Sequence, residues 1–294
     1  MREKIKRTKG ERVVFSIVFA ILAVYAIFIL YHFYFLLQLA TKGSAVEYDR
    51  AILNDTLGTW STNFTLNNFI EAFSAFTDDY GNSFLYMTFN SLWFSIGSML
   101  ICLFFESAAT YVVCKYKFKG RMFIYNLVII RMMLPIVGTL PSAYRIYSEC
   151  GFLNSPTILV TATDALSGGD FLILYAFYKG ISWEYAEAAF IDGANHFEVY
   201  FKIMLRMALP AISVLFITGF IGRWNEYMTI SVFMPEMPTL SYGLYIYEQN
   251  MKYAGGNMPA YFAGVFIAAI PCITLFIIFQ NSIMQTVHMG GIKG

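Results

Sequence analysis

Long apolar runs limit what this sequence can fold into. A helix that crosses a bilayer core of roughly 30 Å needs about 20 apolar residues. Six windows of that length carry few charges: residues 13–38, 84–113, 122–147, 157–178, 207–233 and 261–283. The composition agrees, since 58% of the residues are hydrophobic and only 13% are charged. We therefore expect an all-α integral membrane protein with six transmembrane helices.

The third and fourth runs are the least regular. The third contains Arg131, Pro135 and Pro141, and the fourth is diluted by Asp164 and Asp170. If the count of six is wrong, we expect the error at the fourth run.

The distribution of basic residues predicts the orientation, because short loops rich in Lys and Arg stay in the cytoplasm. Residues 1–12 form a basic tail, and residues 115–121 carry four basic side chains and no acid. Residues 40–83 instead carry six acids against only two basic residues, so we expect them outside. Both termini are then cytoplasmic, residues 13–39 form an uncleaved first helix, and residues 84–294 form a five-helix core.

Enzymatic function classes find little support in the sequence. No glycine-rich run ends in Gly-Lys-Ser or Gly-Lys-Thr, so any energy from ATP must come through another chain. The four cysteines and three histidines are scattered, which predicts neither a metal site nor a disulfide framework. We expect no catalytic residue, no cofactor and no nucleic-acid partner.

The segment 183–206 between the fourth and fifth runs has two helical patterns with a glycine between them. Residues 183–192 carry acids near their start, where a helix dipole favours them. Gly193 predicts a hinge. A second helix should begin at Asn195, with Glu198 in capping-box position, and its apolar residues have the spacing of a surface helix: Phe197, Tyr200, Phe201, Met204 and Leu205. The alternative is a plain amphipathic connector at the membrane surface.

Polar residues inside apolar runs are costly and usually face a bundle interior or a water-filled cavity. Glu106 and Arg131 are candidates for an ion pair between neighbouring spans. Trp224, Asn225 and Glu226 lie 17 to 19 residues into the fifth run and combine an aromatic face with polar groups, which suits a sugar in a transport pathway. Anchoring at the membrane interface is the alternative for these three residues.

Several motifs occur in the order and spacing of one known family across about 230 residues. The chain from Phe64 onward resembles a carbohydrate permease of ATP-binding-cassette (ABC) importers, of the maltose-permease type. The run from Glu187 to Gly193 matches the loop with which these permeases engage their ATPases. The other matching segments are Phe64-Thr65-Leu66-Asn67-Asn68-Phe69, Phe89-Asn90-Ser91-Leu92, Ala108-Ala109-Thr110-Tyr111, Phe118-Lys119-Gly120-Arg121, Met132-Met133-Leu134-Pro135, Phe152-Leu153-Asn154, Gly222-Arg223-Trp224-Asn225-Glu226 and Gly290-Gly291-Ile292-Lys293-Gly294.

The sequence departs from the family pattern on either side of this loop. Arg206 stands where relatives commonly have proline, and proline arrives only at Pro210. Ser182 likewise replaces a proline ahead of the loop. These differences place the local geometry of the loop in question, and leave its glutamate and glycine unchanged.

The resemblance implies a type I importer permease fold and an importer of sugars, first of all di- or oligosaccharides. It implies that Glu187, Ala188, Ala189, Asp192 and Gly193 form the contact that couples the permease to its ATPase. For residues 290–294 it offers contact with the ATPase surface, and the alternative is a frayed terminus. It also implies a bacterial inner-membrane protein whose partners are a second homologous permease, two ABC ATPases that bind the ATP, an extracytoplasmic solute-binding protein and membrane lipid. The competing function is a secondary transporter or a channel for small polar solutes, although we see no repeated halves.

Overall fold

The computed structural model describes residues 8–61, 63–76, 81–134, 137–161 and 168–290. The chain divides into two units. Unit 1 comprises residues 1–75 and 247–267, and unit 2 comprises residues 76–246 and 268–294. The basic residues at positions 2–7, Pro135, Asp164 and the tail from Gly291 lie outside the described residues.

All the elements of the described part are helices, and most are separated by short turns. In chain order they are α1 (Lys9–Ala40), α2 (Ala45–Leu53), α3 (Asn67–Ala75), α4 (Phe84–Lys115), α5 (Arg121–Met133), α6 (Leu140–Glu149), α7 (Ile158–Thr161), α8 (Gly169–Gly180), α9 (Glu184–Ile191), α10 (His196–Glu198), the π-helix η1 (Val199–Met204), α11 (Leu205–Trp224), α12 (Met228–Phe233), α13 (Leu240–Ala254) and α14 (Met258–Gly290).

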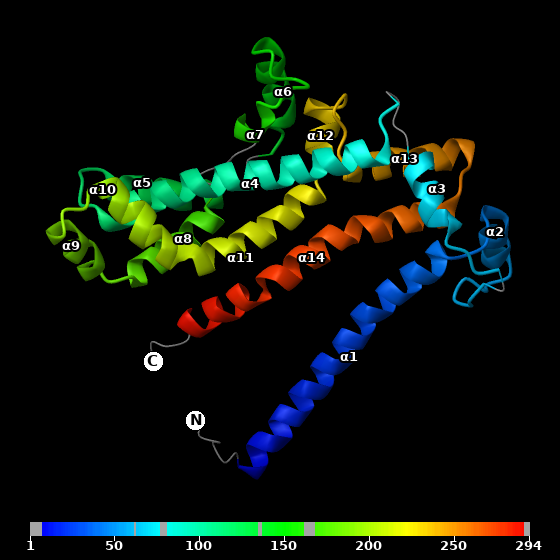
Figure 1. Ribbon diagram of the computed structural model, residues 1–294, viewed down its shortest axis with the longest axis horizontal. Helices are drawn as coiled ribbons and strands as arrows, with labels where there is room; N and C mark the ends of the chain where they lie inside the picture. Colours follow the sequence, from blue (N-terminus) through cyan, green and yellow to red (C-terminus); the bar gives the residue numbers. More distant parts are fainter. Residues whose placement is uncertain (1–7, 62, 77–80, 135–136, 162–167, 291–294) are drawn as a thin grey trace. The chain divides into compact units, whose positions relative to one another are not determined.

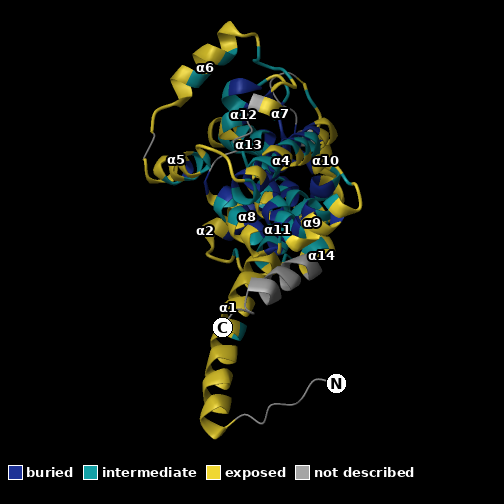
Figure 2. Cartoon of the chain, turned by 90° about the vertical axis from the view of Figure 1, so that its left-hand side faces the viewer, coloured by how far each residue is buried: buried dark blue, intermediate teal, exposed yellow. Residues whose placement is uncertain are grey.

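Unit 1 begins with the most apolar helix, α1. Its N-terminus is fixed by a capping box between Thr8 and Glu11. The 18-residue window of α1 with the highest hydropathy contains no buried residue in the isolated chain, and Figure 2 shows the helix in yellow along most of its length. A helix that is apolar on all sides and unburied in its own chain must be covered by lipid or by another protein.

The end of α1 is fixed by buried polar contacts within unit 1. The Asn68 side chain donates hydrogen bonds to the backbone oxygens of Ala40 (2.9 Å) and Lys42 (2.7 Å). The ammonium of Lys42, itself buried, donates to the Thr59 backbone oxygen at 3.1 Å. These contacts replace water around buried donors and acceptors, and they connect the end of the helix to the following loop.

In unit 2, α4 is the central helix. It packs along both α8 and α11, and Figure 1 shows α11 running beside it. The shared core includes Leu103 from α4, Leu174 from α8 and Leu215 from α11. Because α4 is surrounded by its neighbours, it buries polar as well as apolar residues, among them Ser95, Ser98 and Glu106.

Four of the expected spans are confirmed as long apolar helices in the described part of the chain. They run over Lys9–Ala40, Phe84–Lys115, His196–Trp224 and Met258–Gln280. The fifth span is displaced toward the N-terminus relative to the expected run 207–233, because its helix ends at Trp224 and a separate helix, α12, follows at Met228–Phe233.

The third and fourth runs are not continuous helices. The third divides into α5 and α6, and Pro141 lies in the first turn of α6, where its missing N–H costs nothing. Pro135 would break a hydrogen bond of any helix that continued through it. The fourth divides into the four-residue α7 and the twelve-residue α8. At 1.5 Å per residue, α5 and α8 each extend about 20 Å, less than a bilayer core of about 30 Å.

Candidate functional site

The helix α9 presents an exposed face at one end of unit 2 (Figure 1). Glu187, Ala188 and Asp192 are exposed, and Ile191 is 86% exposed. The opposite face carries Ala186 and Ala189, both buried in the core cluster. Two acids lie in the first turn of this helix, where the aligned peptide dipoles favour negative charge. The exposed face therefore offers an acid, a small residue and an apolar residue to a partner.

The five residues expected to couple the chain to an ATPase do not all face the same way. Glu187, Ala188, Asp192 and Gly193 face solvent, whereas Ala189 packs inward. Alanine at positions 186 and 189 lets α9 approach its own core closely. These small residues thus fix the position of α9, and Ala188 is the one exposed on its outer face.

The turn that ends α9 requires glycine. Gly193 has a φ of +85°, in the left-handed region that residues with a Cβ avoid. Its N–H donates to the Phe190 oxygen at 3.0 Å, and the Ala194 N–H donates to the Ala189 oxygen at 2.9 Å. These two bonds form a Schellman motif, which satisfies the last carbonyls of the helix. The expected glycine hinge is confirmed.

The next helix begins at the expected residue. The Asn195 side chain accepts a hydrogen bond from the Glu198 N–H at 2.9 Å, and the Asn195 N–H donates to the Glu198 carboxylate at 3.1 Å. This capping box is confirmed. Lys202 pairs with the other carboxylate oxygen of Glu198 at 2.7 Å, so α9 and α10 are joined by a short turn with few free polar groups.

The expected helix from Asn195 onward is present, but it is not separate from the fifth span. The chain passes from α10 through η1 into α11 without a break, and Pro210 lies inside α11. The π turn adds a residue to the helix and changes which side chains share a face. Tyr200 and Met204 are consequently buried, whereas Phe197 is 76% and Phe201 is 43% exposed.

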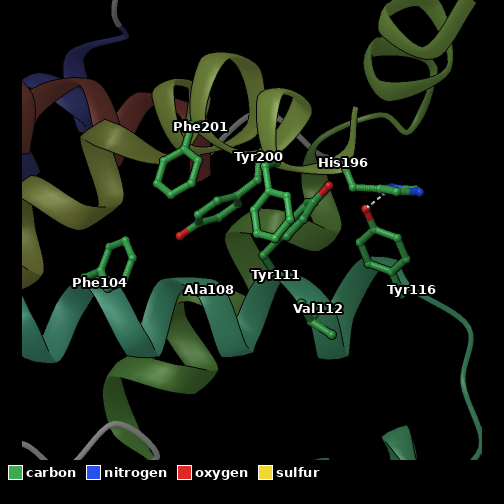
Figure 3. A pocket seen from close by; sticks show the side chains of 9 residues that line it. Phe104, Ala108, Tyr111, Val112, Tyr116, His196, Tyr200 and Phe201 are labelled. Carbon is green, nitrogen blue, oxygen red and sulfur yellow. Dashed lines mark hydrogen bonds between the residues drawn. The ribbon is translucent and has the colours of Figure 1, made fainter. Parts of the chain in front are cut away.

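An aromatic cluster holds this loop against the end of α4 (Figure 3). The Tyr116 hydroxyl and the His196 Nδ1 are hydrogen-bonded at 2.8 Å. The His196 ring also meets the ring of Phe190 from α9, with centroids 4.8 Å apart. Tyr116 contacts Trp183 at a centroid distance of 5.7 Å. The cluster borders an apolar cavity of about 440 Å³ between α4 and the segment formed by α10 and η1.

A hydrogen bond from a lysine side chain to the backbone adds to this attachment. The Lys115 ammonium donates to the Ile181 oxygen at 2.5 Å, which joins the end of α4 to the turn before α9. The contacts of Tyr116, Lys115 and His196 were not anticipated from the sequence. The only local signals were the aromatic rings of Tyr116 and His196 and the positive charge of Lys115, which do not specify their partners.

The three candidate pathway residues occupy the break between α11 and α12, and their environments differ. Trp224 is 2% exposed, stacks on Phe220 and donates from its indole N–H to the Ala268 oxygen at 3.0 Å. Asn225 is exposed, and its side chain donates to the Ile221 oxygen at 2.8 Å. The Glu226 carboxylate accepts from the Thr229 N–H at 2.9 Å at the start of α12. Asn225 is therefore the most accessible of the three.

The two candidate intramembrane charges lie on helices that neighbour each other. Glu106 is fully buried in α4, and Arg131 is exposed in the last turn of α5. Their pairing stays a prediction. Among the described residues, no group of three or more His, Cys, Asp or Glu side chains could hold a metal ion.

Comparison with known proteins places these features in context. Residues 107–288 match the family described as binding-protein-dependent transport system inner membrane component. The chain is 31% identical over 235 residues to the arabinooligosaccharides transport system permease protein AraQ of Halalkalibacterium halodurans, covering 78% of this chain and 80% of the relative. It is 25% identical over 221 residues to the diacetylchitobiose uptake system permease protein NgcG of Streptomyces coelicolor, covering 74% and 72%.

A solved structure is similar over almost the whole chain. It is the crystal structure of a bacterial ABC transporter involved in the import of the acidic polysaccharide alginate. The TM-score is 0.73, and the match covers 94% of this chain and 98% of the other. At 17% sequence identity, this likeness concerns the fold alone.

Proposed function

Because the chain belongs to the family of binding-protein-dependent transport system inner membrane components, we propose that it is the permease subunit of an ATP-driven oligosaccharide importer. The protein is a multi-pass membrane protein of this family, with several helices long and apolar enough to cross a bilayer. It supplies the pathway and the gate, and it takes its energy from ATPase subunits that bind the ATP.

The exposed face of α9 is the observation that carries this proposal. Its acid, Glu187, and its small residue, Ala188, lie outside the core and are free to meet another protein. The Schellman turn at Gly193 and the capping box at Asn195 hold this face in one orientation. An acidic, well-ordered surface suits a cleft with a basic side chain on a partner. We assign this contact to the ABC ATPase, with Asp192 at its edge.

Movement at this contact is then carried into the membrane helices. The loop continues directly into α11, and its aromatic cluster attaches it to α4. Closure of two ATPase subunits on ATP would move α9, and α4 and α11 would follow. This motion would switch the pathway between inward and outward access.

The remaining partners follow from this role. The importer contains a second, homologous permease, two ABC ATPases and an extracytoplasmic solute-binding protein. The apolar surface of α1, which is exposed in the isolated chain, is covered by lipid or by the second permease. We place both termini in the cytoplasm and residues 40–83 outside a bacterial inner membrane, since positive loops stay inside.

The transported sugar is an oligosaccharide. The relatives are described by the arabinooligosaccharides and diacetylchitobiose that they transport or take up. The segment 224–226 lines the pathway: exposed Asn225 meets sugar hydroxyls, the indole of Trp224 holds the break in the helix open, and Glu226 begins α12. Amide and carboxylate groups of this kind fix the orientation of a ligand rich in hydroxyl groups.

Charge reversal at position 187 tests the contact with the ATPase. The complete importer is reconstituted in vesicles with Glu187→Lys in this chain, and uptake of radiolabelled arabinotriose, galactotriose and diacetylchitobiose is measured. We expect lower recovery of the ATPase with the variant and a fall in uptake of about tenfold, since a reversed charge at an interface costs more than 1 kcal/mol.

The matched control is Glu236→Lys. Glu236 is also an exposed acid of unit 2, and it lies in the turn after α12 (Met228–Phe233), far along the chain from α9. This variant should behave like the natural chain. Wild-type recovery of the ATPase and wild-type uptake with Glu187→Lys would remove α9 from the coupling contact. Failure of the natural chain to import any of the three sugars with ATP would overturn the sugar assignment.

A further inference from the structure

Three buried hydroxyl groups meet between α4, α8 and η1, beside the segment 183–206, which we call the coupling loop. Tyr200 of η1 donates to the Ser107 oxygen at 3.1 Å, and Ser107 is hydrogen-bonded to the Tyr178 hydroxyl at 2.7 Å. The three residues come from three helices: Ser107 from α4, Tyr178 from α8 and Tyr200 from η1. All three are buried. We name this set of three residues the hydroxyl joint.

The bonds of the joint are held in place by burial. A hydroxyl that leaves its partner in a buried site cannot turn to water, so it loses a hydrogen bond without replacement. The serine oxygen accepts from one tyrosine and still has a proton and a lone pair for the other. The joint therefore fixes the separation of three helices more strictly than apolar contact alone.

One residue of the hydroxyl joint, Tyr200, lies in the π-helix η1. The Leu205 N–H donates to the Tyr200 oxygen, an i→i−5 bond of the π type. The π turn brings Val199, Tyr200 and Met204 to the buried side together. π turns are uncommon and frequently occur at functional sites. In this chain the turn aims the tyrosine hydroxyl at α4.

A series of ring contacts connects the hydroxyl joint to α9, and it ends where the His196 ring meets Phe190 of α9. Tyr111 stands between the two tyrosines of the joint, 5.1 Å from the ring of Tyr200 and 5.6 Å from that of Tyr178. Figure 3 shows Tyr111 and Tyr200 together between α4 and η1. Tyr111 also contacts Tyr116, which is bonded to His196. Ala186 and Ala189 of α9 belong to the same core.

We propose that Ser107, Tyr178 and Tyr200 are positioning residues for coupling, which make the coupling loop and α4 move as one rigid body. The inference rests on the proposed function. The joint adds a specific claim to it: displacement of α9 by an ATPase reaches the pathway through three hydroxyl groups and not through the continuous helix alone.

The test measures a distance across the joint. In a chain whose four cysteines are replaced by alanine, spin labels are attached at Ile191→Cys on α9 and Phe105→Cys on α4, both exposed positions. The distance distribution is recorded for the assembled importer without nucleotide and after trapping with ATP and vanadate. A rigid joint predicts a narrow distribution that is the same in both states.

Removal of single hydroxyls provides the comparison. Tyr200→Phe and Ser107→Ala should each broaden the Ile191–Phe105 distribution by about twofold, since a buried polar partner no longer fixes the geometry. The double variant should be no broader than the worse single variant, because both remove the same bond. Ser107→Thr keeps the hydroxyl and should restore the narrow distribution. Tyr185→Phe, which alters an exposed tyrosine of α9, is the matched control.

A second pair of spin labels distinguishes loss of the Tyr200–Ser107 bond from a general loosening of the protein. Phe105→Cys and Ile173→Cys report on α4 and α8, which stay bonded through Ser107 and Tyr178 in Tyr200→Phe. This pair should be unchanged in that variant. The proposal is overturned if the distance distributions of both label pairs broaden equally in Tyr200→Phe. It is also overturned if the Ile191–Phe105 distribution stays narrow in Tyr200→Phe and Ser107→Ala, or if the Ile191–Phe105 distance in the natural chain changes on trapping.

The outcome is distinct from failure of the proposed function. If no ATPase is trapped with the natural chain, the importer assignment fails. The nucleotide-free distributions of the natural chain and its variants then still decide whether the hydroxyl groups hold the loop to α4.

Discussion

At Gly193 the backbone adopts a φ of +85°, and an added Cβ would meet no atom of this chain within 4 Å. A side chain at this position is therefore opposed by the backbone conformation and not by crowding within the subunit. Any steric conflict would come from a partner. Neighbouring residues also differ in the segment 224–226, where Trp224 is buried and Asn225 is exposed.

Replacement of Gly193 tests the hinge. Gly193→Val should cost about 1 to 2 kcal/mol at the turn, since an L residue in the left-handed region places its Cβ near the following oxygen. The ATPase should co-purify less and uptake should fall. Gly193→Asn is the matched control, because asparagine tolerates this region better. Equal loss in both variants would indicate a requirement for empty space at a partner, and not for a backbone conformation.

Substitution of Trp224 and Asn225 should have different effects. Trp224→Leu removes a ring stack and a buried hydrogen bond and should lower the Tm, at a cost of about 2 kcal/mol. Asn225→Leu should leave the Tm nearly unchanged and reduce sugar uptake. Thermal unfolding and uptake are measured on the same preparations. Normal uptake in a stably expressed Asn225→Leu protein would assign this residue to the membrane interface.

At the scale of elements, the coupling segment is one short helix, α9, followed by the first turns of the long helix that runs from α10 through η1 into α11. The helix α9 is only eight residues long. An isolated helix of this length is unstable in water. The order of the segment comes from the Schellman turn, the capping box and the aromatic contacts with α4. The segment is consequently sensitive to the loss of a single cap.

Loss of the cap should loosen the start of α10. Asn195→Ala removes the acceptor for the Glu198 N–H and should cost about 1 kcal/mol, the usual value of an N-cap. Hydrogen exchange at Glu198 should accelerate by about fivefold, the factor that corresponds to this free energy. Asn195→Ser retains a capping oxygen and should exchange at nearly the original rate. Unchanged exchange in Asn195→Ala would show that aromatic packing alone holds the turn.

At the scale of the whole molecule, the chain exposes more apolar surface than its own fold can cover. The first span is unburied and the last is only 11% buried over its apolar window, whereas half of the corresponding window of α4 is buried. Lipid alone can cover this apolar surface. The role proposed for this chain, however, requires a second permease against part of it.

Co-expression tests this requirement. The chain is produced with its ATPase and binding protein, with and without a second permease of the same gene cluster. We expect a stable complex and sugar uptake only when both permeases are present, because the exposed helices otherwise lack a protein partner. Full uptake by this chain with ATPase and binding protein alone would contradict the heterodimer and indicate pairing between two copies.

Features set by neighbouring residues could be read from the sequence, and features set by distant contacts could not. Apolar runs of sufficient length specify α1, α4, α11 and α14, because a chain in lipid must satisfy its backbone hydrogen bonds within each helix. The turn at Gly193 and the cap at Asn195 likewise depend on a few adjacent residues.

Only the tertiary structure decided how these elements meet. The bonds of Ser107 to Tyr178 and Tyr200 span 71 and 93 residues, and no local pattern specifies such partners. The π turn that merges the surface segment with the fifth span, the inward position of Ala189 and the burial of Trp224 also depend on packing against α4, α8 and α14. Periodicity identifies a helix and its apolar face, but close packing determines which neighbour that face contacts.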